Sequence, residues 1–97
     1  MRIKFPLEPF NTLVRNGTIE AAMQKLVANS KPEAAYFTSL DGHRGGFLVV
    51  DMASASEIPH LAEPWFLTLN AEVTFHPAMT PEDLGRAGLN ALGKQWA

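Results

Sequence analysis

AAYFTSLDGHRGGFLVVDM, residues 34–52, is the stretch that decides the fold of this chain. Its two ends, residues 34–40 and 47–52, are rich in the β-branched and aromatic side chains that are typical of strands. Between them, Asp41-Gly42-His43-Arg44-Gly45-Gly46 predicts a hairpin turn, because glycine readily adopts the positive φ that tight turns need. The sequence therefore predicts a central antiparallel hairpin.

One alternating segment lies on each side of this hairpin in the sequence. In residues 1–7 apolar side chains alternate with the cations Arg2 and Lys4, and in residues 71–76 they alternate with polar side chains. A period of two residues indicates a strand with one buried face. The side chains expected to be buried are Ile3, Phe5, Leu7, Val73 and Phe75, and Glu72, Thr74 and His76 are expected to face the other way.

A helix is expected between the first strand and the hairpin, and another at the C-terminus. Thr18 is the expected N-cap of the first, whose apolar residues recur at helical spacing until Ser30-Lys31-Pro32. The C-terminal helix begins at Thr80-Pro81-Glu82-Asp83 and contains Gly85, Gly88 and Gly93, each of which costs about 1 kcal/mol relative to alanine. Such a helix is typical of close packing against another surface, for which a second subunit is a candidate.

A third helix is expected between the hairpin and the last strand. It begins at Ser54, which fits a capping box with Glu57, or at Ser56, which places Pro59 in the first turn. Pro64 is expected to kink it, since proline cannot donate to the carbonyl four residues earlier. Its apolar stripe comprises Ile58, Leu61, Ala62, Trp65, Phe66 and Leu69.

The elements follow the order strand, helix, strand, strand, helix, strand, in one domain that covers residues 1–97. Two right-handed crossovers around a hairpin predict an α+β fold with one four-stranded antiparallel sheet, in the spatial order fourth, first, third, second strand. Both long helices then cover the same face, and the other face is uncovered. Besides the outward residues named above, this face is expected to carry Phe47, Val49 and Asp51, with either Tyr36 and Thr38 or Ala35, Phe37 and Ser39.

The uncovered face is mixed in character, with charges beside apolar side chains. A sheet that faces water usually alternates more cleanly. Packing two such faces together would bury the apolar part and let Arg2 and Lys4 pair with Asp51 and Glu72. We therefore expect a symmetric homodimer through the sheet face.

Composition excludes several classes of function. Among 97 residues, 46% are hydrophobic and 19% charged, as in ordinary globular domains, and the net charge of −2 is too small to steer a nucleic acid or an anionic membrane. The chain has no cysteine, so disulfides and thiol chemistry are excluded. No signal peptide or long apolar run is recognised, and the expected compartment is the cytoplasm. No cofactor motif is present.

His76 is the best single candidate for catalysis, as a general base at the end of an outward alternation. The ordinary interpretation, favoured here, is that it ends a strand and pairs with a neighbour. Tyr36 and Trp65 are expected in the core but are also candidates to line a pocket. Arg2 and Lys4 are candidates to bind an anionic ligand, although cross-strand ion pairing is the favoured use.

The other histidines and the glycine-rich turn are interpreted structurally. His43 is expected in the hairpin turn and His60 on the polar side of a helix, so that no metal site is expected. The turn at residues 41–46 links two strands rather than opening a helix, and it matches no phosphate-binding pattern.

Three strings carry a resemblance to a known superfamily: residues 8–11 (EPFN), residues 32–37 (PEAAYF) and residues 70–77 (NAEVTFHP) running into residues 79–84 (MTPEDL). With the element order, they make the chain similar to the ferredoxin-like domains of the dimeric α+β barrel superfamily, and within it to a group of small bacterial proteins of unknown function. The resemblance implies pairing through the sheets but selects no chemistry.

Three hypotheses of function follow. The first is a homodimeric barrel that is a scaffold or binds a small molecule. The second is a cofactor-independent isomerase or monooxygenase-like enzyme that acts on a small aromatic or lactone-like substrate through His76. The third is an interaction module that uses the free edge of the strand at residues 34–40.

Overall fold

The computed structural model describes all of residues 1–97. The elements, in chain order, are β1 (Arg2–Lys4), α1 (Phe10–Arg15), α2 (Ile19–Ser30), β2 (Ala34–Leu40), β3 (His43–Val49), the 3₁₀ turn η1 (Ala55–Glu57), α3 (Ile58–Leu69), β4 (Glu72–Thr74), α4 (Pro81–Arg86) and α5 (Leu89–Gln95).

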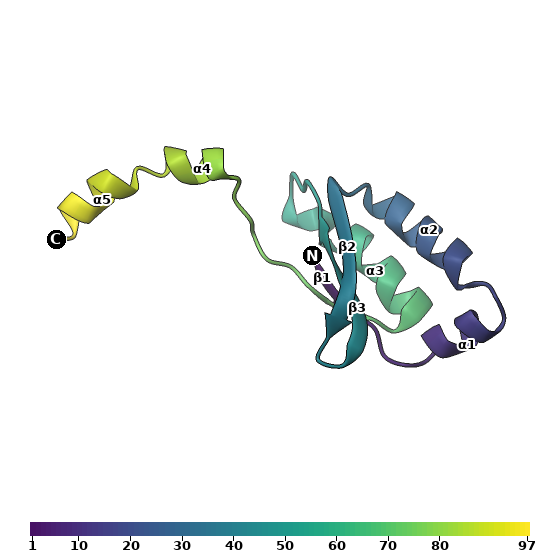
Figure 1. Cartoon of the computed structure of the whole chain (residues 1–97). Coiled ribbons are helices and arrows are strands. Elements are labelled where there is room, and N and C mark those ends of the chain that lie inside the picture. The colour runs from purple at the N-terminus through teal and green to yellow at the C-terminus, as the bar shows by residue number, and fades with distance from the viewer.

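The four strands form one antiparallel sheet in the order β2-β3-β1-β4. This confirms the expected α+β class and the expected strand order. Helices α2 and α3 lie together on one side of the sheet (Figure 1). The opposite side, called the open face below, has no helix on it.

The hairpin turn is shorter than predicted, and β3 begins four residues earlier than the predicted strand. The turn consists of Asp41 and Gly42, with φ of 53° and 76°, and Leu40 pairs directly with His43. Positive φ at both central residues is the requirement of the two-residue type I′ turn. Gly45 and Gly46 therefore belong to a strand and not to a turn.

The first and last strands in the sequence are also shorter than their alternation suggested. β1 is followed by Phe5 and Pro6, and proline has no N–H with which to continue a ladder. Leu7 is exposed, so its predicted burial is wrong, whereas Ile3 and Phe5 are buried as predicted. On the neighbouring edge strand, β4 ends at Thr74, and His76 lies outside the strand.

The core lies between the sheet and helices α2 and α3. Its largest fully buried side chains are Trp65, Ile3, Leu48 and Leu69. The predicted stripe of α3 is confirmed at Leu61, Ala62, Trp65 and Leu69, and is wrong at Ile58 and Phe66, which are exposed. The apolar residues of α3 therefore extend beyond the part of the helix surface that the sheet and α2 bury.

Side-chain caps form at two of the three predicted helix starts. Ser54 with Glu57 and Thr80 with Asp83 form complete capping boxes. Thr18 is at the N-cap position of α2, as predicted, but its side chain accepts no capping hydrogen bond, and its hydroxyl donates to Asn16 Oδ1.

Pro64 lies inside α3 and frees the carbonyl of His60 from its helical partner. Asn29 Nδ2 of α2 donates to that oxygen at 3.2 Å. The proline therefore leaves an acceptor that ties the two core helices together.

The C-terminal segment leaves the domain. Two short helices replace the single predicted one, because Gly88, with φ of 70°, separates α4 from α5. Every residue from 76 to 97 is exposed, and this segment is called the arm below. It extends away from the sheet (Figure 1), and the whole molecule measures 60 × 28 × 18 Å. No helix has the length and apolar character that crossing a membrane requires.

Candidate functional site

The strand register identifies the side chains on the open face. Arg2 lies between Phe47 and Thr74 on the neighbouring strands, and Lys4 lies between Gly45 and Glu72. Tyr36 lies beside Phe47 on the other side, which resolves the open alternative for β2 in favour of Tyr36 and Thr38. The face therefore has an apolar half on β2 and β3 and a charged half on β1 and β4.

The apolar half consists of Tyr36, Phe47 and Val49, called the apolar patch below. Tyr36 is 69% exposed and Phe47 43% exposed, and Val49 is exposed to a similar degree. All three belong to paired strands of a sheet whose other face is covered. Isolated apolar side chains on a surface are ordinary, but a contiguous group on an uncovered sheet face is typical of an interaction site.

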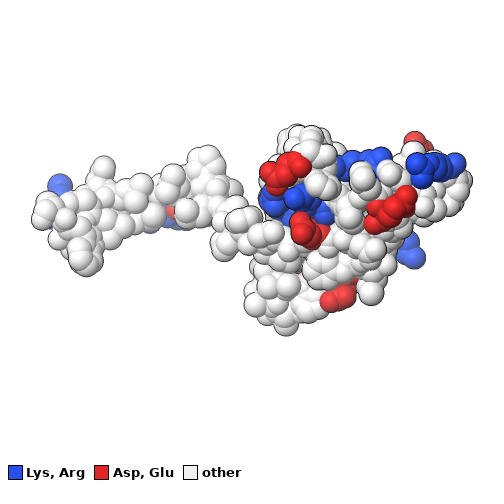
Figure 2. All heavy atoms as spheres, turned by 90° about the horizontal axis from the view of Figure 1, so that it is seen from below, with Lys and Arg blue, Asp and Glu red and all other residues white.

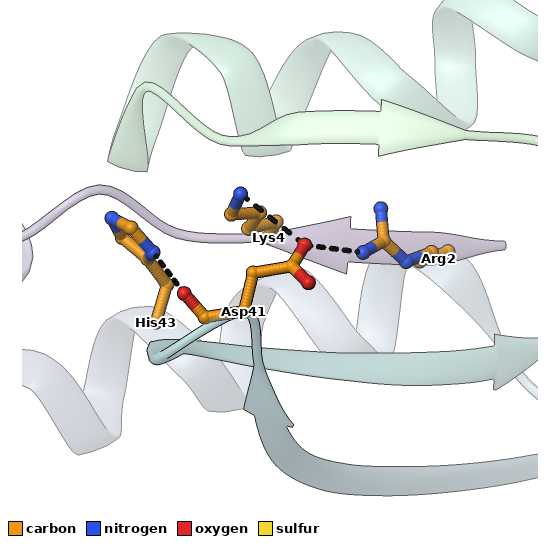
Figure 3. Close-up of polar contacts among 4 residues, drawn as sticks. All are labelled: Arg2, Lys4, Asp41 and His43. Carbon is orange, nitrogen blue, oxygen red and sulfur yellow. Dashed lines mark hydrogen bonds and ion pairs between the residues drawn. The ribbon is translucent and has the colours of Figure 1, made fainter.

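The charged half centres on Asp41. Its Oδ2 lies 3.2 Å from Arg2 Nη2 and 3.5 Å from Lys4 Nζ, so one carboxylate bridges two cations of β1 (Figure 3). His43 Nδ1 donates to the Asp41 carbonyl at 3.1 Å. These four residues are called the charged cluster below.

The cluster corrects the predicted ion pairs. Within the subunit, the favoured cross-strand pairing of Arg2 and Lys4 with Glu72 and Asp51 is replaced by pairing with Asp41. Asp51 lies beyond the end of β3, whereas the two-residue turn places Asp41 over β1. A turn residue that is distant in sequence therefore replaces the cross-strand partner.

A small cavity of about 180 Å³ adjoins the charged cluster. Its lining residues come from the end of β1, the start of β3 and the entry to β4: Lys4, Phe5, Pro6, His43, Asn70 and Glu72. His43 and Asn70 were missed as site residues. The Asp41-Gly42 pair was the available signal for His43, since a two-residue turn places the following residue directly opposite Leu40.

Gly45 lies in a crowded stretch of β3, opposite Lys4. A side chain at this position would meet Leu40 Cδ1 at 2.6 Å and the Ile3 carbonyl oxygen at 2.7 Å. Leu40 therefore folds over a bare stretch of β3 beside Lys4.

The other predicted site residues lie apart from each other. Trp65 is 0% exposed in the core, on the opposite side of the sheet from Tyr36, so the two line no common pocket. His76 lies exposed in the segment between β4 and α4, and His60 lies exposed on α3. No three side chains among His, Asp and Glu gather as metal ligands would.

One carboxylate with a shifted pKa lies at the start of α1, away from the open face. The Thr12 hydroxyl donates to Glu8 Oε2 at 2.7 Å, and this hydrogen bond is the main reason that the pKa of Glu8 is below its ordinary value. The Thr12 N–H also donates to it, at 3.1 Å. Glu8 therefore acts as a cap of α1.

Comparison of the chain with known protein families, with curated proteins and with solved structures found no match in any of the three.

Proposed function

We propose that this protein works as a homodimer in which the open faces of two subunits meet, and that the seam binds a small molecule. In this proposal the subunit is ferredoxin-like and the pair is a dimeric α+β barrel. The observation that carries the proposal is the apolar patch, which lies on the one face of the sheet that no helix covers.

Burial of the patch supplies the driving force. Each Å² of apolar surface removed from water contributes about 25 cal/mol, and an aromatic side chain presents about 150–250 Å². Tyr36 and Phe47 together with their symmetry mates would form the centre of the seam. Aromatic residues at the centre of an interface commonly carry most of its binding energy.

The ligand class follows from the neighbours of the patch. Arg2 lies directly beside Phe47 in the register, so a cation and an aromatic ring are adjacent on the same face. A small aromatic carboxylate fits this pair, because its ring would lie on Phe47 and its carboxylate near Arg2 and Lys4. Asp41 competes for those two cations.

The dimer is tested with Phe47→Lys. We expect the wild-type chain to sediment as a dimer at micromolar concentration, and Phe47→Lys to raise the dimer dissociation constant at least about tenfold, because it buries a charge at the centre of the seam. Phe66→Lys is the matched control, since Phe66 is 37% exposed but lies on α3, away from the open face. A monomeric wild type, or equal effects of the two substitutions, would refute the proposal.

Ligand binding is tested with benzoate and related aromatic carboxylates by thermal shift and calorimetry. A ligand that binds the native state raises the unfolding midpoint. We expect Lys4→Gln to weaken binding several-fold and Asp41→Asn to strengthen it, because the second change releases both cations. Asp51→Asn is the control. A flat response across the series, or loss of binding in Asp41→Asn, would leave the dimer without its proposed ligand class.

A further inference from the structure

The small cavity beside the charged cluster is lined by groups of opposite charge. It lies at the end of the sheet that carries the hairpin turn, and from this end basic and acidic side chains are seen close together on the domain (Figure 2). Lys4 and His43 line it from β1 and β3, and Asn70 and Glu72 line it from the entry to β4. Phe47, on which the aromatic carboxylate was placed above, is not part of its lining.

The carboxylate of Glu72 is unpaired within the subunit. Glu72 lies directly opposite Lys4 in the register of β1 and β4. The Lys4 ammonium nevertheless pairs with Asp41 from the hairpin turn, at 3.5 Å, and Glu72 takes part in no ion pair. The cavity therefore has a cation that is only partly neutralised and an anion that is free.

His43 contributes a hydrogen-bond acceptor to the same cavity. Its Nδ1 lies 3.1 Å from the carbonyl oxygen of Asp41, which can only accept, so Nδ1 carries the proton. In a neutral imidazole the other nitrogen, Nε2, is then an acceptor. Nε2 lies on the far side of the ring from the Asp41 carbonyl (Figure 3). The hairpin turn thus fixes which ring nitrogen is left for a ligand.

The charges and the acceptors define the ligand. A primary ammonium group has three N–H donors, and the acceptors that line the cavity are the Glu72 carboxylate, the Asn70 amide oxygen and His43 Nε2. A carboxylate on the same ligand would pair with the Lys4 ammonium in a charge-assisted hydrogen bond. The matching ligand therefore carries both charges.

The size of the cavity limits the ligand further. A volume of about 180 Å³ corresponds to roughly six water molecules at about 30 Å³ each, and hence to roughly six non-hydrogen atoms. An amino acid as small as alanine has this size. The buried ring of Phe5 and the ring of Pro6 provide the apolar part of the lining, against which a methyl group would lie.

We propose that this cavity binds a small zwitterionic amino acid of the size of alanine. Its ammonium group lies between Glu72 and His43, with the Asn70 amide oxygen as a further acceptor, and its carboxylate lies on Lys4. All of these residues belong to one subunit. The inference therefore goes beyond the proposed dimer and does not depend on it.

The first test compares alanine with two analogues that each lack one charge, propionate and ethylamine, in NMR titrations of the full chain. We expect alanine to bind at least about tenfold more tightly than either analogue, because only alanine uses both sides of the cavity. The largest shifts are expected at His43 and Asn70. Equal affinities for the three compounds, or shifts centred elsewhere, would overturn the inference.

The second test removes one ligand contact at a time. Glu72→Gln removes the free charge and is expected to weaken alanine binding at least about tenfold while leaving propionate binding no weaker. Asn70→Gly removes the side-chain amide, and glycine retains the backbone conformation at this position, whose φ is 53°, so a several-fold loss is expected without a change of fold.

Glu63→Gln is the matched control, since Glu63 is an exposed carboxylate on α3, away from the cavity. Its alanine affinity should equal that of the wild type. Unchanged binding in both cavity variants, or an equal loss in Glu63→Gln, would show that the amino acid binds elsewhere, and the inference would fail.

Phe47→Lys separates this inference from the proposed function. Because Phe47 does not line the cavity, we expect this variant to bind alanine as the wild type does. Loss of alanine binding in Phe47→Lys would place the ligand in the seam and overturn the inference. A monomeric wild type refutes the dimer and leaves this inference standing, whereas a wild type that binds no alanine refutes this inference and leaves the dimer standing.

Discussion

Replacing Trp65 by alanine is expected to lower the free energy of unfolding by about 3–5 kcal/mol, the usual cost of removing a large buried aromatic side chain. Trp65 is 0% exposed, and its ring centroid lies 5.9 Å from that of Phe5, which in turn lies 5.3 Å from Phe10. The indole therefore packs α3 against Phe5, which follows β1, and through Phe5 against the start of α1. The total free energy of unfolding of a native protein is only about 5–15 kcal/mol, so this variant is close to unfolding.

The indole nitrogen gives this prediction a second part. Trp65 Nε1 is buried and has no hydrogen-bond partner, which costs about 1–3 kcal/mol. Trp65→Phe keeps most of the apolar ring and removes this donor, so we expect a loss well below that of alanine. Urea unfolding followed by circular dichroism measures both variants.

Leu67→Ala is the matched control for Trp65, because Leu67 lies on the same helix but is 80% exposed. We expect its unfolding free energy to stay within about 0.5 kcal/mol of wild type. Equal losses for Trp65→Ala and Leu67→Ala would show that α3 packs with a different face. If Trp65→Ala fails to fold, the unfolding free energies of Trp65→Phe and Leu67→Ala still compare the buried face of α3 with its exposed face.

Replacing Gly46 by alanine is expected to lower the free energy of unfolding by about 1–3 kcal/mol, the range typical of overpacking. The added Cβ would lie 2.8 Å from the Tyr36 carbonyl oxygen and 2.9 Å from Phe37 Cδ1. The phenyl ring can turn aside, but the carbonyl belongs to β2 and moves only if the β2–β3 ladder distorts. The expected loss of stability therefore comes from a steric clash with the backbone of β2 and not from an unfavourable φ at residue 46.

Gly93→Ala is the control for this substitution. A Cβ on Gly93 would meet nothing within 4 Å, and alanine is about 1 kcal/mol more favourable than glycine inside a helix. We expect Gly93→Ala to be neutral or stabilising in thermal unfolding at a low protein concentration. A destabilisation of Gly93→Ala as large as that of Gly46→Ala would contradict the assignment of Gly46 to a crowded strand.

Local sequence rules determined the elements and their order. Alternation identified β1 and β4 and the buried Ile3 and Phe5. A capping box made Ser54 one of two possible helix starts, and the Thr-Pro-Glu-Asp pattern identified the start at Thr80. The crossover rule then led to the order β2-β3-β1-β4. Alternation also placed Arg2 and Lys4 on the open face. These signals act over a few residues, so they can be read without knowing which elements meet.

Only the tertiary structure decided the partners. Arg2 pairs with Asp41, which is 39 residues away in sequence, because the β2–β3 turn lies beside β1 in the sheet. Gly45 and Gly46 resembled turn residues, since a sequence does not distinguish a glycine that needs positive φ from one crowded by its neighbours.

Exposure was decided in the same way. Trp65 and Tyr36 were one class of aromatic residue in the sequence, and the fold buried the first and left the second on the open face. The arm carries ordinary helix signals and yet lies outside the core. Burial and ion pairing depend on which side chains come close together in space. That proximity is a property of the assembled fold and not of any local stretch of sequence.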